Sequence, residues 1–179
     1  IQAENPLGTA PVGGLIRKFA IPAIISMLVS AMYNIVDQIF IGQGVGMLGN
    51  AATNVAFPVT TIATAMALLL GIGGASNYNL EMGAGREKKA SSIAGTALSS
   101  LAISGAVLCV IVVLFLKPLL TLFGATKDVM PYAADYTGIT ALGLPFYILS
   151  VGGNHVVRAD RSPTYSMACV TAGAVINTI

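Results

Sequence analysis

The stretch SSIAGTALSSLAISGAVLCVIVVLFL, residues 91–116, decides the fold class of this chain. It has no charged residue and is long enough to cross a bilayer as a helix, which takes roughly 20 mostly apolar residues. Across the whole chain 55% of residues are hydrophobic and 9% are charged, whereas soluble domains carry about 25% charged residues. Because so few charges cannot cover a soluble surface, we expect an all-α integral membrane protein whose apolar side chains face the lipid bilayer.

Four further apolar segments flank this one, so the sequence predicts a polytopic bundle of about five transmembrane helices. The expected spans are residues 19–41, 52–80, 91–116, 131–157 and 163–179, the last of them incomplete. The second span carries threonines at 60, 61 and 64 that suggest it lines something. Because the chain opens with Ile1 and ends inside an apolar run, we expect a fragment that packs against a missing remainder of the same polypeptide.

The basic residues of the short loops predict the orientation of the bundle. One side would carry Arg17, Lys18, Arg86, Lys88, Lys89, Arg158 and Arg161, and the other only Lys117 and Lys127. Cytoplasmic loops are enriched in Lys and Arg. The N-terminus is therefore expected in the cytoplasm.

No motif of the sequence indicates catalysis or metal binding. Gly44, Gly46 and Gly49 have the spacing of a dinucleotide-binding loop, but they follow a predicted membrane span rather than a strand, so we expect a flexible external turn. His155, the only histidine, is expected to be an interfacial polar residue, and the two cysteines are expected to be small buried hydrophobes. We therefore expect no enzyme and no metal site. The net charge of +2, spread over dispersed basic residues, argues against nucleic acid as a partner.

Polar residues inside the first predicted span indicate a wet cavity. They recur at three- and four-residue intervals, which places them on one helix face: Ser26, Ser30, Tyr33, Asn34 and Asp37. A charged side chain at the bilayer centre costs about 2.5–3.5 kcal/mol, and such residues mark ion and proton pathways. The alternative is that Asp37, one turn from the end of the span, reaches outward to water.

The fourth predicted span repeats this pattern with Tyr136, Thr140, Gly143, Tyr147, Ser150 and Asn154. Such rows can also be packing seams between helices, which is the interpretation we prefer for Gly143; amides and phenols favour a cavity lining. Pro22 lies early in the first span. Pro145 lies in the middle of the fourth span, where it should kink the helix and free a backbone carbonyl.

Five motifs taken together resemble one transporter family. They are AIPAIIS at 20–26, YNIVDQIFIG at 33–42, EMGAGR at 81–86, NHVVRADRSP at 154–163 and GAVIN at 173–177. In this combination they are similar to multidrug and toxic compound extrusion (MATE) transporters, most closely to the bacterial DinF/MepA-like branch, over essentially the whole chain. One departure is Arg161, where members of the family usually carry a small residue.

The resemblance implies a twelve-helix fold of two lobes working by alternating access, of which residues 1–179 would form part of the N-lobe. It implies a secondary antiporter in the bacterial cytoplasmic membrane that exports small cationic or amphipathic drugs in exchange for H⁺ or Na⁺, with no other cofactor. In that picture Asp37 is the coupling carboxylate, and Asn177, Asn154 and Tyr136 belong to the same cation or proton site. The expected cavity lining is Ser30, Tyr33, Asn34, Thr140 and Tyr147, and the expected bending points are Pro22 and Pro145.

Two other functions stay open at this point. A lipid-linked precursor flippase of the same superfamily should line its cavity with several Arg and Lys residues, and none lies deep in a predicted span. A small helical membrane subunit or channel, complete at five helices, fits poorly with a truncated fifth span. Neither the substrate nor the choice between H⁺ and Na⁺ can be read from the sequence.

Overall fold

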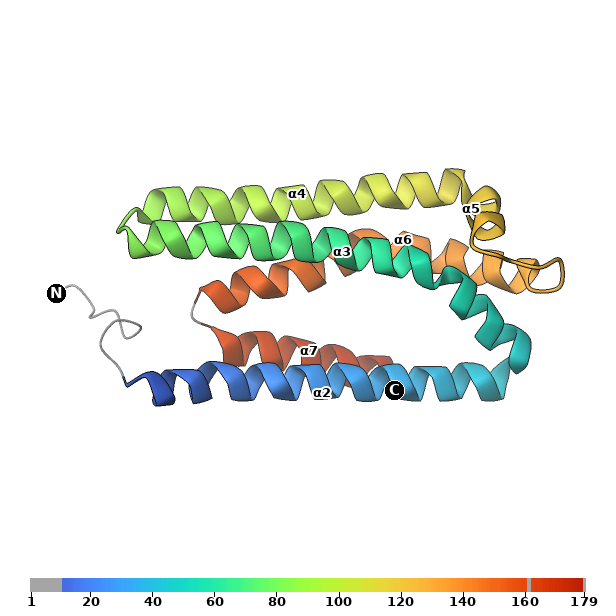
Figure 1. Cartoon of the computed structure of the whole chain (residues 1–179), viewed down its shortest axis with the longest axis horizontal. Coiled ribbons are helices and arrows are strands. Elements are labelled where there is room, and N and C mark those ends of the chain that lie inside the picture. The colour runs from blue at the N-terminus through green and yellow to red at the C-terminus, as the bar shows by residue number, and fades with distance from the viewer. Residues whose placement is uncertain (1–10, 161, 179) are drawn as a thin grey trace. The chain divides into compact units, whose positions relative to one another are not determined.

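The computed structural model describes residues 11–160 and 162–178, apart from the side chains of Tyr33, Asn177 and Thr178. The described part contains six helices and no strand (Figure 1): α2 (Val12–Gly44), α3 (Met47–Gly83), α4 (Glu87–Leu114), α5 (Leu116–Leu122), α6 (Met130–Ala159) and α7 (Pro163–Thr178). The expected all-α fold is confirmed. Arg161 lies outside the described residues.

Three of the described helices, α2, α3 and α4, are long and apolar enough to cross a membrane. The helix α6 has 30 residues, but its row of polar side chains lowers its hydropathy and it is not among the three. The apolar part of α7, Pro163–Ile176, is shorter. Length and composition thus mark the first three predicted spans more clearly than the last two.

The connections between helices differ from expectation in two places. The predicted glycine-rich external turn shrinks to Val45 and Gly46, whose φ of +72° suits glycine; Gly44 ends α2 and Gly49 is buried inside α3. The second difference is α5, a helix of seven residues where a loop was expected. It forms because its buried Leu120 packs with Ala52, Val129 and Ala133, which stabilises a turn of helix outside the long spans.

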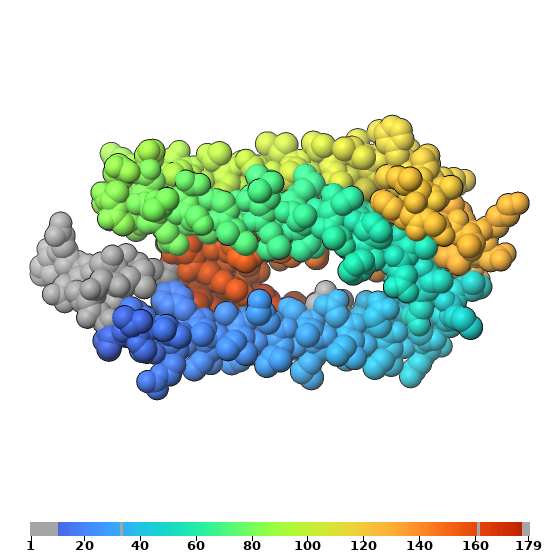
Figure 2. All heavy atoms as spheres, viewed as in Figure 1, coloured from blue at the N-terminus to red at the C-terminus, as the bar shows by residue number. Residues whose placement is uncertain are grey.

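The chain divides into two compact units, one of residues 38–160 and one of residues 1–37 with 161–179. In the first unit, α3 and α4 run side by side as an antiparallel hairpin (Figure 1), and their atoms lie in contact along the face visible in Figure 2. The helix α6 packs against both of them. The core between the three helices consists of Val59, Ala63, Ala67, Leu101, Leu108, Val112, Ala141, Leu144 and Ile148.

Glycines bring the backbones of these three helices into contact. A Cβ placed on Gly71 of α3 would lie 2.6 Å from the Cα atom of Gly152 on α6. A Cβ on Gly105 of α4 would lie 2.6 Å from the Cα atom of Pro145, also on α6. Small residues at such crossings let membrane helices approach closely enough for dispersion forces to hold them together. These contacts fix where α6 crosses the hairpin.

The α3–α4 turn is held by a small ion-pair cluster. Gly85 adopts a φ of +75°, and the carboxylate of Glu81 accepts a hydrogen bond from Arg86 and pairs with Lys89 at 2.9 Å. The hydrogen bond to Glu81 raises the pKa of the Arg86 guanidinium. Because exposed ion pairs contribute little to stability, the cluster mainly neutralises cations at this end of the hairpin.

The glycine contact gives a direct test of the packing. Gly71→Ala should lower the free energy of unfolding by about 1–3 kcal/mol, because the new methyl group must push α6 away from α3. Gly73→Ala is the matched control, since a Cβ there meets nothing within 4 Å. The measurement is thermal or denaturant unfolding in detergent micelles. Equal stability of the two variants would contradict the close contact.

Candidate functional site

The polar row of α6 lies outside the core of its unit. The core-facing side of α6 carries the buried residues Ala133, Thr137, Ala141, Leu144, Ile148 and Val156. The polar row is half-buried at Tyr136, Thr140 and Asn154 and exposed at Gly143, Tyr147 and Ser150. The two sets occupy different strips of the helix, so the polar row lies beside the apolar core rather than in it.

Gly143 does not act as a packing residue within the described part of the chain. A Cβ on Gly143 would meet nothing within 4 Å, whereas one on Gly105 or Gly152 would collide with a neighbouring helix. The glycines that pack helices are therefore those of the hairpin crossing. The expectation of a packing seam at Gly143 finds no support here.

A hydroxyl pair joins the polar row to α3. The Oγ1 atom of Thr64 lies 2.9 Å from the hydroxyl oxygen of Tyr147. Thr64 Oγ1 also donates to the backbone carbonyl of Thr60 at 2.8 Å. Since a hydroxyl has one proton, the Tyr147 hydroxyl donates to Thr64. Thr64 of the second predicted span thus lies beside the polar row of the fourth, a pairing that periodicity within one helix could not reveal.

Several polar side chains of both units hydrogen-bond to the carbonyl one turn earlier on their own helix. Thr140 Oγ1 donates to Tyr136 at 2.9 Å and Asn154 Nδ2 donates to Ser150 at 3.1 Å. On α2, Asn34 Nδ2 donates to Ser30 at 2.7 Å. Such bonds satisfy hydroxyl and amide protons where water is scarce. They lower the free-energy cost of carrying a polar row on a membrane helix.

The predicted coupling residues are distributed over the two units. Asp37 is half-buried on α2, whose polar face also carries the buried Ser26. The backbone of Asn177 belongs to α7 in the same unit, and its side chain lies outside the described residues, as does that of Tyr33. Tyr136 and Asn154 lie on α6 in the other unit. The cation site that these four residues would form stays a prediction.

Neither predicted bending point interrupts its helix. Pro22 lies within α2, where its carbonyl accepts a hydrogen bond of 2.8 Å from Ser26 Oγ. Pro145 lies within α6 against Gly105 of α4. At about 100° per residue, Pro145 is roughly 160° around the axis from Tyr147, so it serves the helix crossing rather than the polar row.

Sequence reasoning missed a polar pair at the end of the hairpin that carries Glu81. The hydroxyl of Tyr78, buried on α3, donates to Asp160 Oδ1 at 2.5 Å. Asp160 follows the last residue of α6 and lies in the RAD sequence that helped to identify the resemblance. The pair therefore ties α3 to the end of α6.

In the described part of the chain, no group of three or more His, Cys, Asp or Glu side chains could hold a metal ion. The charged side chains there lie near helix ends and in loops rather than around a common centre. What the first unit does present is a strip of hydroxyls, a phenol and amides on α3 and α6. Such a strip can hydrogen-bond to a ligand or to water.

Comparisons with known proteins agree on one family. The MatE family model matches residues 22–179. A FAD transporter of Shewanella oneidensis is 29% identical over 179 residues, which is 100% of this chain and 39% of that protein. The multidrug export protein MepA of Staphylococcus haemolyticus is 27% identical over 161 residues, or 90% of this chain and 36% of that protein. The chain thus spans well under half the length of these relatives.

A solved structure gives the same result. The structure of the MATE multidrug transporter DinF-BH superposes on this chain with a TM-score of 0.88 at 36% sequence identity. The superposition covers 98% of this chain and 39% of that one.

The hydroxyl pair can be tested by a double-mutant cycle of Tyr147→Phe and Thr64→Val. Hydrogen bonds between membrane helices contribute about 0.6 kcal/mol on average and up to about 1.7 kcal/mol. We expect a coupling free energy in this range from unfolding in detergent, because each variant removes one end of the same 2.9 Å contact. Tyr132→Phe, on an exposed tyrosine of the same helix, is the control. Strict additivity of Tyr147→Phe and Thr64→Val would refute the pair.

Proposed function

Since the chain belongs to the MatE family, we propose that it acts in a secondary active antiporter that exports cationic or amphipathic compounds in exchange for H⁺ or Na⁺. The observation that carries the proposal is the family match over residues 22–179. The relatives that this chain resembles are transporters rather than enzymes, and several carry the name multidrug export protein.

The distribution of polar groups supports a transport role. In lipid, polar residues away from a packed core are costly unless they face water or a ligand. The row of α6 from Tyr136 to Asn154 lies outside the core, and Tyr147 of this row hydrogen-bonds to Thr64. We assign this strip to the wall of a substrate pathway. Its hydroxyls and phenols suit a flat, amphipathic molecule better than they suit a single small ion.

We assign the coupling step to Asp37. A carboxylate on a helix of membrane-spanning length and hydropathy raises the free energy of insertion, and such a residue marks an ion or proton pathway. When ionised, it attracts a cationic substrate; when it takes up H⁺ or binds Na⁺, that attraction is lost and release is favoured. The resemblance gives Asn177, Asn154 and Tyr136 a share in this step as hydrogen-bonding partners.

We place the protein in the bacterial cytoplasmic membrane with its N-terminus in the cytoplasm. The support is the basic sequence of the α3–α4 turn, from Arg86 to Lys89, together with Arg158 near the end of α6. The opposite end of the hairpin carries only Lys117 and Lys127.

A second candidate substrate is a dinucleotide such as FAD. A relative named FAD transporter matches the whole chain at 29% identity. FAD carries a negatively charged pyrophosphate, however, and each described Lys or Arg lies in a loop or within about two turns of a helix end. The proposed coupling carboxylate Asp37, together with the lack of such a cation among the described residues, favours a positively charged substrate.

The role of Asp37 predicts the behaviour of Asp37→Asn in the complete polypeptide. Efflux of ethidium from cells should fall at least about tenfold, because a neutral amide neither titrates nor attracts the cation. Glu87→Gln, at an exposed acid on the cytoplasmic end of α4 by our assignment, should leave efflux unchanged. Both variants must reach the membrane in equal amounts. Normal efflux by Asp37→Asn would refute the assignment.

The substrate class and the coupling ion can be separated in proteoliposomes of the complete polypeptide. We expect ethidium transport driven by an imposed H⁺ or Na⁺ gradient, and no FAD transport under the same gradients, because the pathway has no deep cation to hold a pyrophosphate. The gradient that drives transport identifies the ion. Transport of FAD without transport of ethidium would contradict the cationic substrate class.

A further inference from the structure

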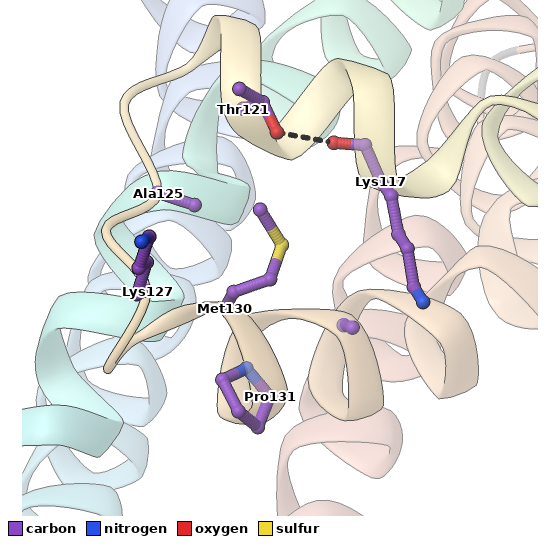
Figure 3. Close-up of a pocket in the computed structure, with 7 residues that line it drawn as sticks. Lys117, Thr121, Ala125, Lys127, Met130 and Pro131 are labelled. Carbon is purple, nitrogen blue, oxygen red and sulfur yellow. Dashed lines mark hydrogen bonds between the residues drawn. The ribbon is translucent and has the colours of Figure 1, made fainter.

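A cavity of about 550 Å³ lies where α5 and the start of α6 meet, at the end of the hairpin opposite the α3–α4 turn. Its lining combines two cations with apolar side chains and one hydroxyl: Lys117, Thr121, Ala125, Lys127, Met130, Pro131 and Ala134. Figure 3 shows Lys117 extending from α5 and Lys127 standing on the opposite side, with the Met130 side chain between them. No carboxylate belongs to the lining.

The two lysines have no acidic partner in the described part of the chain. The ion pairs of Glu81 with Arg86 and Lys89 include neither lysine of the cavity. Asp128 is next to Lys127 in sequence, yet it neither lines the cavity nor pairs with either ammonium group. Two ammonium groups that share a cavity repel each other, and an anion between them would offset this repulsion.

A second cavity of the same unit shows what a neutralised site looks like. It measures about 510 Å³, lies between α3 and α4, and includes Lys89 in its lining. There Glu81 belongs to the same lining and lies 2.9 Å from the Lys89 ammonium. The contrast is specific: of the two cavities, only the one at α5 presents uncompensated positive charge.

The cavity lies at the end of an apolar segment, where we expect the boundary between the acyl chains and the lipid head groups. Lys117 follows directly after the apolar run 107–116, which ends α4 and begins α5. Leu114 and Leu122, on either side of it, are 71% and 77% exposed, as expected of side chains in contact with acyl chains. A lysine at the end of such a run extends its ammonium group to the level of the lipid phosphates while its aliphatic stem stays in the apolar layer. Thr121 donates its hydroxyl proton to the Lys117 backbone carbonyl at 2.9 Å (Figure 3), so the two lysines are the donors that the cavity offers.

We propose that this cavity binds the phosphate of an anionic phospholipid, with Lys117 and Lys127 as the cationic contacts and Met130 and Pro131 against the start of the acyl chains. Two ammonium groups beside an apolar surface match the negative phosphate and the apolar chains of an anionic lipid. The apolar half of the lining favours a lipid over a free phosphate ion, which would leave Met130 and Pro131 without a partner. The lining shares no residue with the polar row of α6.

Native mass spectrometry of the chain in detergent, with added phosphatidylglycerol or phosphatidylcholine, tests the proposal. We expect phosphatidylglycerol to bind more tightly than phosphatidylcholine, and the double variant Lys117→Gln with Lys127→Gln to weaken phosphatidylglycerol binding by at least about fivefold. Lys117→Arg with Lys127→Arg should retain binding, because the charge is kept. Lys88→Gln, an exposed lysine at the other end of the hairpin, is the matched control and should bind as the parent does.

Three results would overturn the proposal. The first is unchanged phosphatidylglycerol binding by the double glutamine variant. The second is an equal loss in Lys88→Gln, which would indicate attraction to net charge rather than a site. The third is complete displacement of phosphatidylglycerol by millimolar inorganic phosphate, which would assign the cavity to a soluble anion. Unchanged thermal unfolding of the double variant would show that the loss of binding does not come from misfolding.

Discussion

The contact between the backbones of α6 and the α3–α4 hairpin is the constraint on which the rest of the first unit depends. Lipid tails are as apolar as leucine, so membrane helices gain little from hiding apolar side chains from lipid and must gain from close packing instead. Gly71 against Gly152, and Gly105 against Pro145, bring the backbones closer than any Cβ would permit. At these crossings, a larger residue would separate the helices.

Close contact on one side of α6 determines what its other sides present. With Gly152 and Pro145 held against α3 and α4, the row from Tyr136 to Asn154 must point away from the core, since a helix cannot turn about its axis without breaking both contacts. The Tyr147 hydroxyl then lies within reach of Thr64, beside the core rather than in it. The same glycines that pack the helices therefore orient the strip that we assign to the substrate pathway.

The parts of the structure that depend on one helix at a time could be predicted, and those that depend on two could not. The apolar run 107–116 and the three- and four-residue spacing of Tyr136, Thr140 and Asn154 are local signals, and the helices that they predict are confirmed. The Thr64–Tyr147 and Tyr78–Asp160 pairs join residues 83 and 82 positions apart, so they depend on how helices cross. Gly143 and Gly105 look alike in sequence, yet only Gly105 packs against a neighbouring helix.

Helix α5 was not predicted because its stability comes from Leu120 packing with Ala52 and Ala133, not from its own seven residues.

Lysine and arginine side chains are neutralised by an acid at one end of the hairpin and not at the other. At the α3–α4 turn, Glu81 neutralises two of the neighbouring cations within the protein. At the α5 end, Lys117 and Lys127 share a cavity without an acid, and so the compensating charge must come from outside the described chain. By the orientation that we propose, this end lies on the outer side of the membrane, where short loops rarely carry lysines. An anionic head group at the same depth would offset the repulsion between the two lysines and hold α5 and the start of α6 together, at the one end of the hairpin where no ion pair of the described residues does so.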